Sequence, residues 1–96
     1  MYGVKMMHAH IVVYGHVQGV GFRYSVRQLA IEHGLNGWVK NNLDGTVEME
    51  VEGEEKPLTV FIEKLKTGRF NRFCRIDDLS VKVMDNEKGF KTFHIK

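Results

Sequence analysis

The chain has 96 residues, of which 43% are hydrophobic and 27% charged, and it carries a formal net charge of +2. These values predict one globular domain with a single core of two packed layers. Cys74 is the only cysteine, which excludes an internal disulfide or a cysteine-based zinc site and favours a reducing compartment. The first residues lack the apolar stretch of a signal peptide, and no run approaches the about 18 apolar residues of a membrane span. We therefore expect a cytoplasmic protein that does not contact membranes.

The first third of the chain predicts a strand followed by a helix. Residues 7–14 alternate loosely between polar and apolar types and end in β-branched residues, as a strand does. From Phe22 onward, apolar residues recur at i, i+4, i+7 and i+8, which is the spacing of an amphipathic helix. Gly34 can adopt the left-handed conformation that ends many helices, so the helix is expected to stop there.

A hairpin follows the helix. Residues 37–41 and 45–53 predict two strands around Asp44 and Gly45, a dipeptide typical of tight hairpin turns. In the second strand, apolar residues alternate with Glu48 and further glutamates, so one face is expected to be buried and the other to face solvent. This pattern assigns Asp44 to the turn and Glu48 to the solvent-facing side rather than to catalysis.

The rest of the chain predicts a second helix and two more strands. Pro57 suits the first turn of a helix, and apolar residues at i, i+3, i+4 and i+7 continue that helix to Gly68. Residues 79–83 are apolar at every second position, and Phe93 and Ile95 share one face of a short last strand. The order of elements predicts an α+β fold: a ferredoxin-like βαββαβ sandwich, with an antiparallel sheet and two helices packed on one face.

The joint between the first strand and the first helix is rich in glycine. Gly15, Gly19 and Gly21 precede the helix, and Phe22 and Arg23 begin it. Glycine tolerates positive φ, so successive N–H groups can turn inward as an anion-binding nest. The helix N-terminus adds free N–H groups and partial positive charge, and the arginine adds a forked, charged donor. The joint therefore predicts a site for a phosphate-sized anion; it does not match the known nucleotide-binding fingerprints.

Two stretches resemble the paired signatures of the acylphosphatase family: GHVQGVGFR at 15–23 and GWVKNNLDGTVE at 37–48. The resemblance extends from about residue 8 to residue 95. Residues 8–96 are therefore expected to form a single acylphosphatase-like domain, and residues 1–7 an N-terminal extension with no required order. The resemblance implies the ferredoxin-like fold. It also implies hydrolysis of the carboxyl–phosphate bond of acyl phosphates, to a carboxylate and inorganic phosphate, without a metal or cofactor.

The resemblance also implies roles for individual residues. Arg23 is expected to be the catalytic guanidinium that holds the phosphoryl oxygens, and Asn41 to orient the attacking water. The residues expected to bind phosphate are Val17, Gln18, Gly19, Val20, Gly21, Phe22 and Arg23. The implied partners are a small acyl phosphate and inorganic phosphate, and the chain is expected to act as a monomer.

The two motifs contain no general acid, which predicts a preference for activated phosphates. A carboxylate leaving group has a pKa of about 4 and departs at neutral pH unprotonated, whereas an alkoxide needs a proton donor. His16 is expected to be structural or solvent-facing, and Trp38 and Phe22 to be core aromatics beside the site. His8 and His10 share a strand face at a spacing that suits a metal, but no third ligand is placed nearby, so no metal site is expected.

Two alternatives stay open: a nucleic-acid-binding module, and an accessory domain without catalysis. The run TGRFNRFCR at 67–75 mixes arginine with phenylalanine, which suits phosphate contacts and stacking. The glutamates of 45–53 would repel a phosphate backbone, so no nucleic-acid partner is expected. Hydrogenase-maturation proteins carry an acylphosphatase-like domain with a similar VQGVGFR run within much longer chains. The segment 67–78 departs from the Gly-Pro and alanine pattern usual in the family, and no role is predicted for it.

Overall fold

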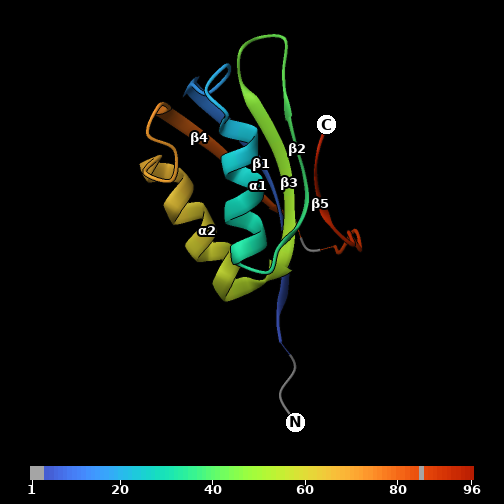
Figure 1. The fold of residues 1–96 in the computed structure, drawn as a ribbon. Helices are drawn as coiled ribbons and strands as arrows, with labels where there is room; N and C mark the ends of the chain where they lie inside the picture. The colour runs from blue at the N-terminus through green and yellow to red at the C-terminus, as the bar shows by residue number, and fades with distance from the viewer. Residues whose placement is uncertain (1–3, 85) are drawn as a thin grey trace.

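The computed structural model describes residues 4–84 and 86–96. Within this part of the chain, five strands and two helices follow one another in the predicted order (Figure 1). Their bounds are β1 Met6–His16, α1 Phe22–Glu32, β2 Asn36–Asn41, β3 Val47–Glu54, α2 Glu55–Thr67, β4 Arg75–Met84 and β5 Phe93–Ile95. Neither described helix combines the length and the apolar character needed to cross a membrane.

The strands form one sheet in the order β4-β1-β3-β2-β5, and both helices lie on one face of it (Figure 1). The pairs β1–β3, β1–β4 and β2–β3 are antiparallel. β5 pairs with β2 in parallel, so the sheet is mixed rather than antiparallel throughout. The reason is that β4 ends at the end of the sheet where β2 begins, so the chain crosses to the far edge and runs beside β2 in the same direction. The predicted ferredoxin-like sandwich is confirmed, with this parallel strand added.

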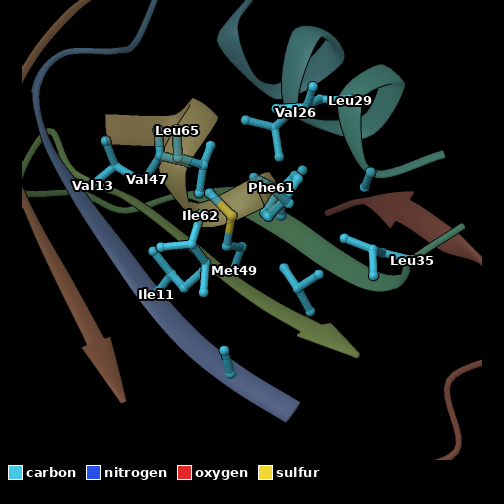
Figure 2. Packing of buried hydrophobic residues seen from close by; sticks show 14 of the residues in the cluster. Ile11, Val13, Val26, Leu29, Leu35, Val47, Met49, Phe61, Ile62 and Leu65 are labelled. Carbon is cyan, nitrogen blue, oxygen red and sulfur yellow. The ribbon is translucent and has the colours of Figure 1, made fainter. Parts of the chain in front are cut away.

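The core lies between the two helices and the sheet. The predicted apolar stripes of both helices are buried there; they are Phe22, Val26, Leu29 and Ala30 on α1, and Leu58, Phe61, Ile62 and Leu65 on α2. Figure 2 shows Phe61 and Ile62 of α2 beside Met49 of β3 and Ile11 of β1. Burial of this apolar surface is the main source of stability for a domain of this size. It holds the ends of β1, α1 and β2 in fixed relative positions.

β1 is longer than the residues 7–14 predicted for it. Met6 pairs with Glu54 and Met7 with Gly53, and the carbonyl of Lys5 accepts a hydrogen bond of 2.9 Å from the N–H that follows β3. Met6 and Met7 of the expected extension 1–7 are therefore part of the sheet and Lys5 is hydrogen-bonded beside it, while residues 1–3 lie outside the described residues. The strand extends because the β3 backbone continues beside it. The side-chain pattern of residues 7–14 gives no sign of this backbone pairing.

β4 is an edge strand, which leaves part of its apolar face uncovered. Leu79 packs against the core, whereas Val81 is 37% and Val83 54% exposed. Both valines lie on the helix side of the sheet, opposite Ile11 and Ala9 of β1. Their exposure shows that the helices leave this edge of the sheet open.

The helix-free face of β3 is less solvated than the alternation of glutamates predicted. Glu48 and Glu50 are half-buried, and each is hydrogen-bonded to a histidine of β1. His10 Nε2 lies 2.6 Å from Glu48 Oε2, and His8 Nε2 lies 2.8 Å from Glu50 Oε1. The hydrogen bond from His10 lowers the pKa of Glu48, against the opposing effect of burial. The two histidines are thus partners of the glutamates; among the described residues no cluster of three or more His, Cys, Asp or Glu could hold a metal ion.

Glu52, on the same face of β3, is buried. Its carboxylate accepts hydrogen bonds from three successive backbone N–H groups, those of Lys88, Gly89 and Phe90. These residues belong to the segment that crosses from β4 to β5. The carboxylate therefore anchors this crossing, which explains why a residue predicted to face solvent is covered.

Candidate active site

The loop of residues 17–21 connects the end of β1 to the first turn of α1. Gly19 (φ 75°) and Gly21 (φ 73°) both adopt the left-handed conformation, which glycine accepts without steric cost. A Cβ at either position would meet no atom within 4 Å, so both glycines border open space. Gly21 is the N-cap of α1, and the amides of the first helical turn have no intrahelical acceptor. Such a backbone, at the positive end of a helix dipole, is suited to an anion.

Gly15 does a different job from the other two glycines. It lies in β1 at φ 139°, where the register between β1 and β4 shifts. A Cβ there would lie 2.0 Å from the carbonyl oxygen of Arg75 and 2.9 Å from the backbone nitrogen of Asp77. The expectation that Gly15 contributes to an anion nest is therefore replaced by a packing role: it lets β4 approach β1 closely.

Three residues hold the loop in place through contacts with the core and with the turn between β2 and β3. The side chain of Val17 is buried in the core, and that of Val20 packs partly against it. Gln18 Nε2 donates to the carbonyls of Asn42 (2.8 Å) and Thr46 (2.9 Å), in the turn between β2 and β3. The side chains of Gln18 and Val20 thus support the loop, and their expected contact with phosphate would come from their backbone N–H groups.

A cavity of about 220 Å³ opens at this point of the fold, far larger than the about 30 Å³ that a water occupies in the liquid. Its lining residues are Val17, Gly19, Gly21, Phe22, Arg23, Tyr24 and Asn41. The structure thus brings together six of the eight expected site residues, including both of those expected to be catalytic. Gln18 and Val20 are the two that do not line it, and Tyr24 lines it without having been predicted.

Arg23 and Asn41 reach the cavity from two different elements. Arg23, in the first turn of α1, is half-buried, and its Nη1 donates to the carbonyl oxygen of Lys96 at 3.1 Å. A guanidinium has five N–H donors in a planar fork, so this contact fixes the group while leaving donors for a ligand. Asn41 is the last residue of β2; it is exposed, and its side chain forms no hydrogen bond within the described parts of the chain.

Arg23 is the only charged residue among the described residues that line the cavity. His16 is exposed at the end of β1, as predicted, and does not line the cavity. Asp44 lies in the β2–β3 turn, where its Oδ1 accepts hydrogen bonds from Thr46 Oγ1 (2.7 Å) and Thr46 N (3.0 Å). These bonds lower the pKa of Asp44 and confirm the turn predicted there. Among the described residues on the lining, the one charged side chain is therefore a cation, and none carries a side-chain carboxylate or imidazole.

Two residues near the cavity were missed from the sequence. Tyr24 is 71% exposed and lines the cavity. Its position directly after Arg23, in the first turn of the helix, could have indicated that it lies beside the site. Asn71, in the segment without a predicted role, donates from Nδ2 to the carbonyl of Val20 at 3.0 Å. Nothing in the sequence indicates this contact, because 51 positions separate the two residues.

The chain is similar to known proteins in its sequence and in its fold. The family model for acylphosphatase matches residues 9–95. An acylphosphatase from Geobacillus kaustophilus is 43% identical over 90 residues, which cover 94% of this chain and 94% of that protein. The crystal structure of acylphosphatase from Bacillus subtilis is similar with a TM-score of 0.89 at 42% identity, over 94% of this chain and 98% of that one. Full-length HypF in its phosphate- and nucleotide-bound form is similar over 99% of this chain and 12% of its own, with a TM-score of 0.88 at 34% identity.

Proposed function

The chain belongs to the acylphosphatase family, which hydrolyses acyl phosphates, and we propose that the cavity beside Arg23 is where it carries out this reaction. One observation carries the proposal: the glycine loop, Arg23 of α1 and Asn41 of β2 line the same cavity. Phosphate would lie against the loop backbone and the guanidinium. The water would lie on the side of Asn41.

The loop and Arg23 supply the electrostatic part of catalysis. In phosphoryl transfer, charge spreads over the three equatorial oxygens, so donors fixed before the reaction stabilise the transition state. The backbone N–H groups around Gly19 and Gly21 and the free N–H groups of Arg23 are such donors. Loss of one donor of this kind typically lowers the rate about 10²–10³-fold.

Asn41 and the leaving group complete the reaction. The side-chain amide of Asn41 has both an acceptor and donors, so it can orient a water for in-line attack. The water oxygen bonds to phosphorus, its proton passes to a phosphate oxygen, and the carboxylate leaves with the electron pair of the broken P–O bond. The carboxylate, with a pKa of about 4, needs no proton. A cavity without a carboxylate or imidazole among its described residues is therefore sufficient for acyl phosphates.

The test compares hydrolysis of benzoyl phosphate by the wild type, Arg23→Ala and Asn41→Ala. Arg27→Ala is the matched control for arginine, because Arg27 is one turn further along α1 and also donates to a backbone carbonyl, that of Phe93 at 3.0 Å. Asn36→Ala, at the other end of β2, is the control for asparagine. We expect kcat/KM to fall at least about 10²-fold in the two site variants and to stay within about threefold in the controls.

Two further measurements sharpen the test. A simple alkyl phosphate should be hydrolysed far more slowly than benzoyl phosphate, and a chelator should leave the rate unchanged. Equal turnover of the two substrates would contradict the leaving-group argument. Site variants that keep wild-type activity would exclude this cavity as the active site.

We further propose that the chain acts as a cytoplasmic monomer on small acyl phosphates, without a nucleic-acid partner. The single thiol of Cys74 and the glutamates of β3 support this proposal. Because the likeness to HypF covers only 12% of that chain, a domain of this kind also occurs within a longer protein, and an accessory domain without catalysis stays the alternative. Turnover of benzoyl phosphate that depends on Arg23 decides between them, because an accessory domain without catalysis would give none.

A further inference from the structure

Asn71 is a buried polar residue in the turn between α2 and β4, and it is 8% exposed. Its Oδ1 accepts hydrogen bonds from the backbone N–H groups of Phe73 (2.9 Å) and Cys74 (3.0 Å). Its Nδ2 donates to the carbonyl of Val20 (3.0 Å) and to Ser25 Oγ (3.0 Å). Both lone pairs and both N–H groups of the side-chain amide are thus used.

The two halves of this amide act on different parts of the fold. The acceptor half shapes its own turn, within three residues of Asn71. The donor half reaches the glycine loop and the first turn of α1. There, Ser25 Oγ in turn donates to the carbonyl of Gly21 at 3.2 Å. The contacts of Asn71 therefore reach the peptide units on both sides of Gly21, directly at Val20 and through Ser25.

We propose that Asn71 is a positioning residue that aims the backbone N–H of Gly21 at the bound phosphoryl group, an inference that rests on the proposed function. In a planar trans peptide the carbonyl of one residue and the N–H of the next point in opposite directions. The Val20–Gly21 peptide is trans, and its carbonyl is held by Asn71. Its N–H is therefore held on the opposite side, at the residue that lines the cavity.

The first variant is Asn71→Asp, which keeps the size and both acceptor contacts but removes the N–H groups that bond Val20 and Ser25. We expect kcat/KM for benzoyl phosphate to fall about 10- to 100-fold, because small displacements of a fixed donor are costly to rate. We expect the inhibition constant of inorganic phosphate to rise in parallel. Asn71→Ala, which adds no charge, should show the same two effects.

Cys74→Ala is the matched control within the same turn. Cys74 Sγ donates to the carbonyls of Gly68 and Asn71, both at 3.3 Å, and among the described residues it forms no hydrogen bond with the glycine loop. This variant loosens the turn but keeps the bond to Val20, so we expect wild-type kinetics at a temperature where it is folded. Wild-type kinetics in folded Asn71→Asp would overturn the inference. A loss in the aspartate variant alone would also overturn it, because added charge would then be the cause.

A nuclear magnetic resonance titration with inorganic phosphate tests the same inference without relying on the variants to fold. In the wild type, the Gly21 amide resonance should shift as phosphate binds, and an unchanged Gly21 amide would overturn the inference. In folded Asn71→Asp the shift should be smaller at equal occupancy. If the wild type binds phosphate at this amide but does not hydrolyse benzoyl phosphate, the proposed function fails while the role of Asn71 stands. If it neither binds nor hydrolyses, both fail.

Discussion

Replacing Gly15 by alanine separates the structural use of the glycine-rich motif from its chemical use. The added Cβ would lie 2.0 Å from the carbonyl oxygen of Arg75 and 2.9 Å from the nitrogen of Asp77. Both are backbone atoms of β4, so the contact is relieved only by opening the β1–β4 pairing. Overpacking costs about 1–3 kcal/mol, and a positive φ in a residue other than glycine costs a similar amount. We therefore expect the free energy of unfolding to fall by about 2–6 kcal/mol.

Gly19→Ala is the comparison within the same motif. Its φ of 75° is left-handed, but a Cβ there meets nothing within 4 Å, so only the conformational cost of about 1–2 kcal/mol applies. The new methyl group would border the cavity, where it keeps a phosphate from approaching the backbone. We expect kcat/KM to fall about tenfold or more, with a smaller loss of stability than in Gly15→Ala.

The assay pairs urea unfolding, followed by circular dichroism, with benzoyl phosphate kinetics at a temperature where each variant is folded. In a thermal melt followed by the same signal, Gly15→Ala should lower the melting temperature by at least about 8 °C for a domain of this size. Its folded fraction should nevertheless retain activity close to that of the wild type. A Gly15→Ala protein as stable as the wild type would refute the packing role. The same loss of activity in both folded variants would refute the separation of the two glycines.

Two other substitutions give independent tests. Tyr24→Phe removes the hydroxyl group of a residue that lines the cavity. We expect kcat for benzoyl phosphate to stay within about twofold, because the carboxylate leaves unprotonated, and a more than tenfold drop would give the hydroxyl a part in the reaction. Glu48→Gln probes the carboxylate whose pKa is lowered, chiefly by the hydrogen bond from His10. Because the pKa of Glu48 is lower in the folded protein than in the unfolded chain, the ionised carboxylate stabilises the fold. This stabilisation is fully present above the unfolded-state pKa of 4.5 and is lost as the pH falls through the folded-state pKa. In urea unfolding near neutral pH, the free energy of unfolding of Glu48→Gln should be about 0.2–1 kcal/mol lower than that of the wild type, and in acid the two should become equal. A difference that grows in acid would contradict a stabilising Glu48–His10 hydrogen bond.

The helices and the residues of the candidate site could be predicted from the sequence because their signals are local. The stripe that begins at Phe22 predicts both the helix and its buried face, and α1 begins at that residue. Arg23 and Asn41 were placed by the resemblance of two short motifs, and the fold brings both to one cavity.

What the sequence left undetermined depends on contacts between distant segments. Glu52 reads as solvent-facing by alternation, yet it is buried because the segment before β5 crosses over it. From the sequence, Gly15 looks like part of the glycine-rich loop. Only the close approach of the β4 backbone shows that its missing side chain is needed for the β1–β4 pairing. Val81 and Val83 have the periodicity of a buried face, but an edge strand leaves them exposed. In each case the deciding neighbour is far away in the chain, where local periodicity carries no information.

Gln18 has a consequence for how this site can change over time. Its side-chain amide joins the loop that would hold the anion to the turn that follows Asn41. A displacement of the turn would therefore also displace the glycine loop, so the group that binds the anion and the residue that orients the water would move together. Substitutions in the β2–β3 turn, at residues 42–46, can therefore change how the water is aligned with the phosphorus atom. They would do so without changing Arg23, Asn41 or the glycine loop.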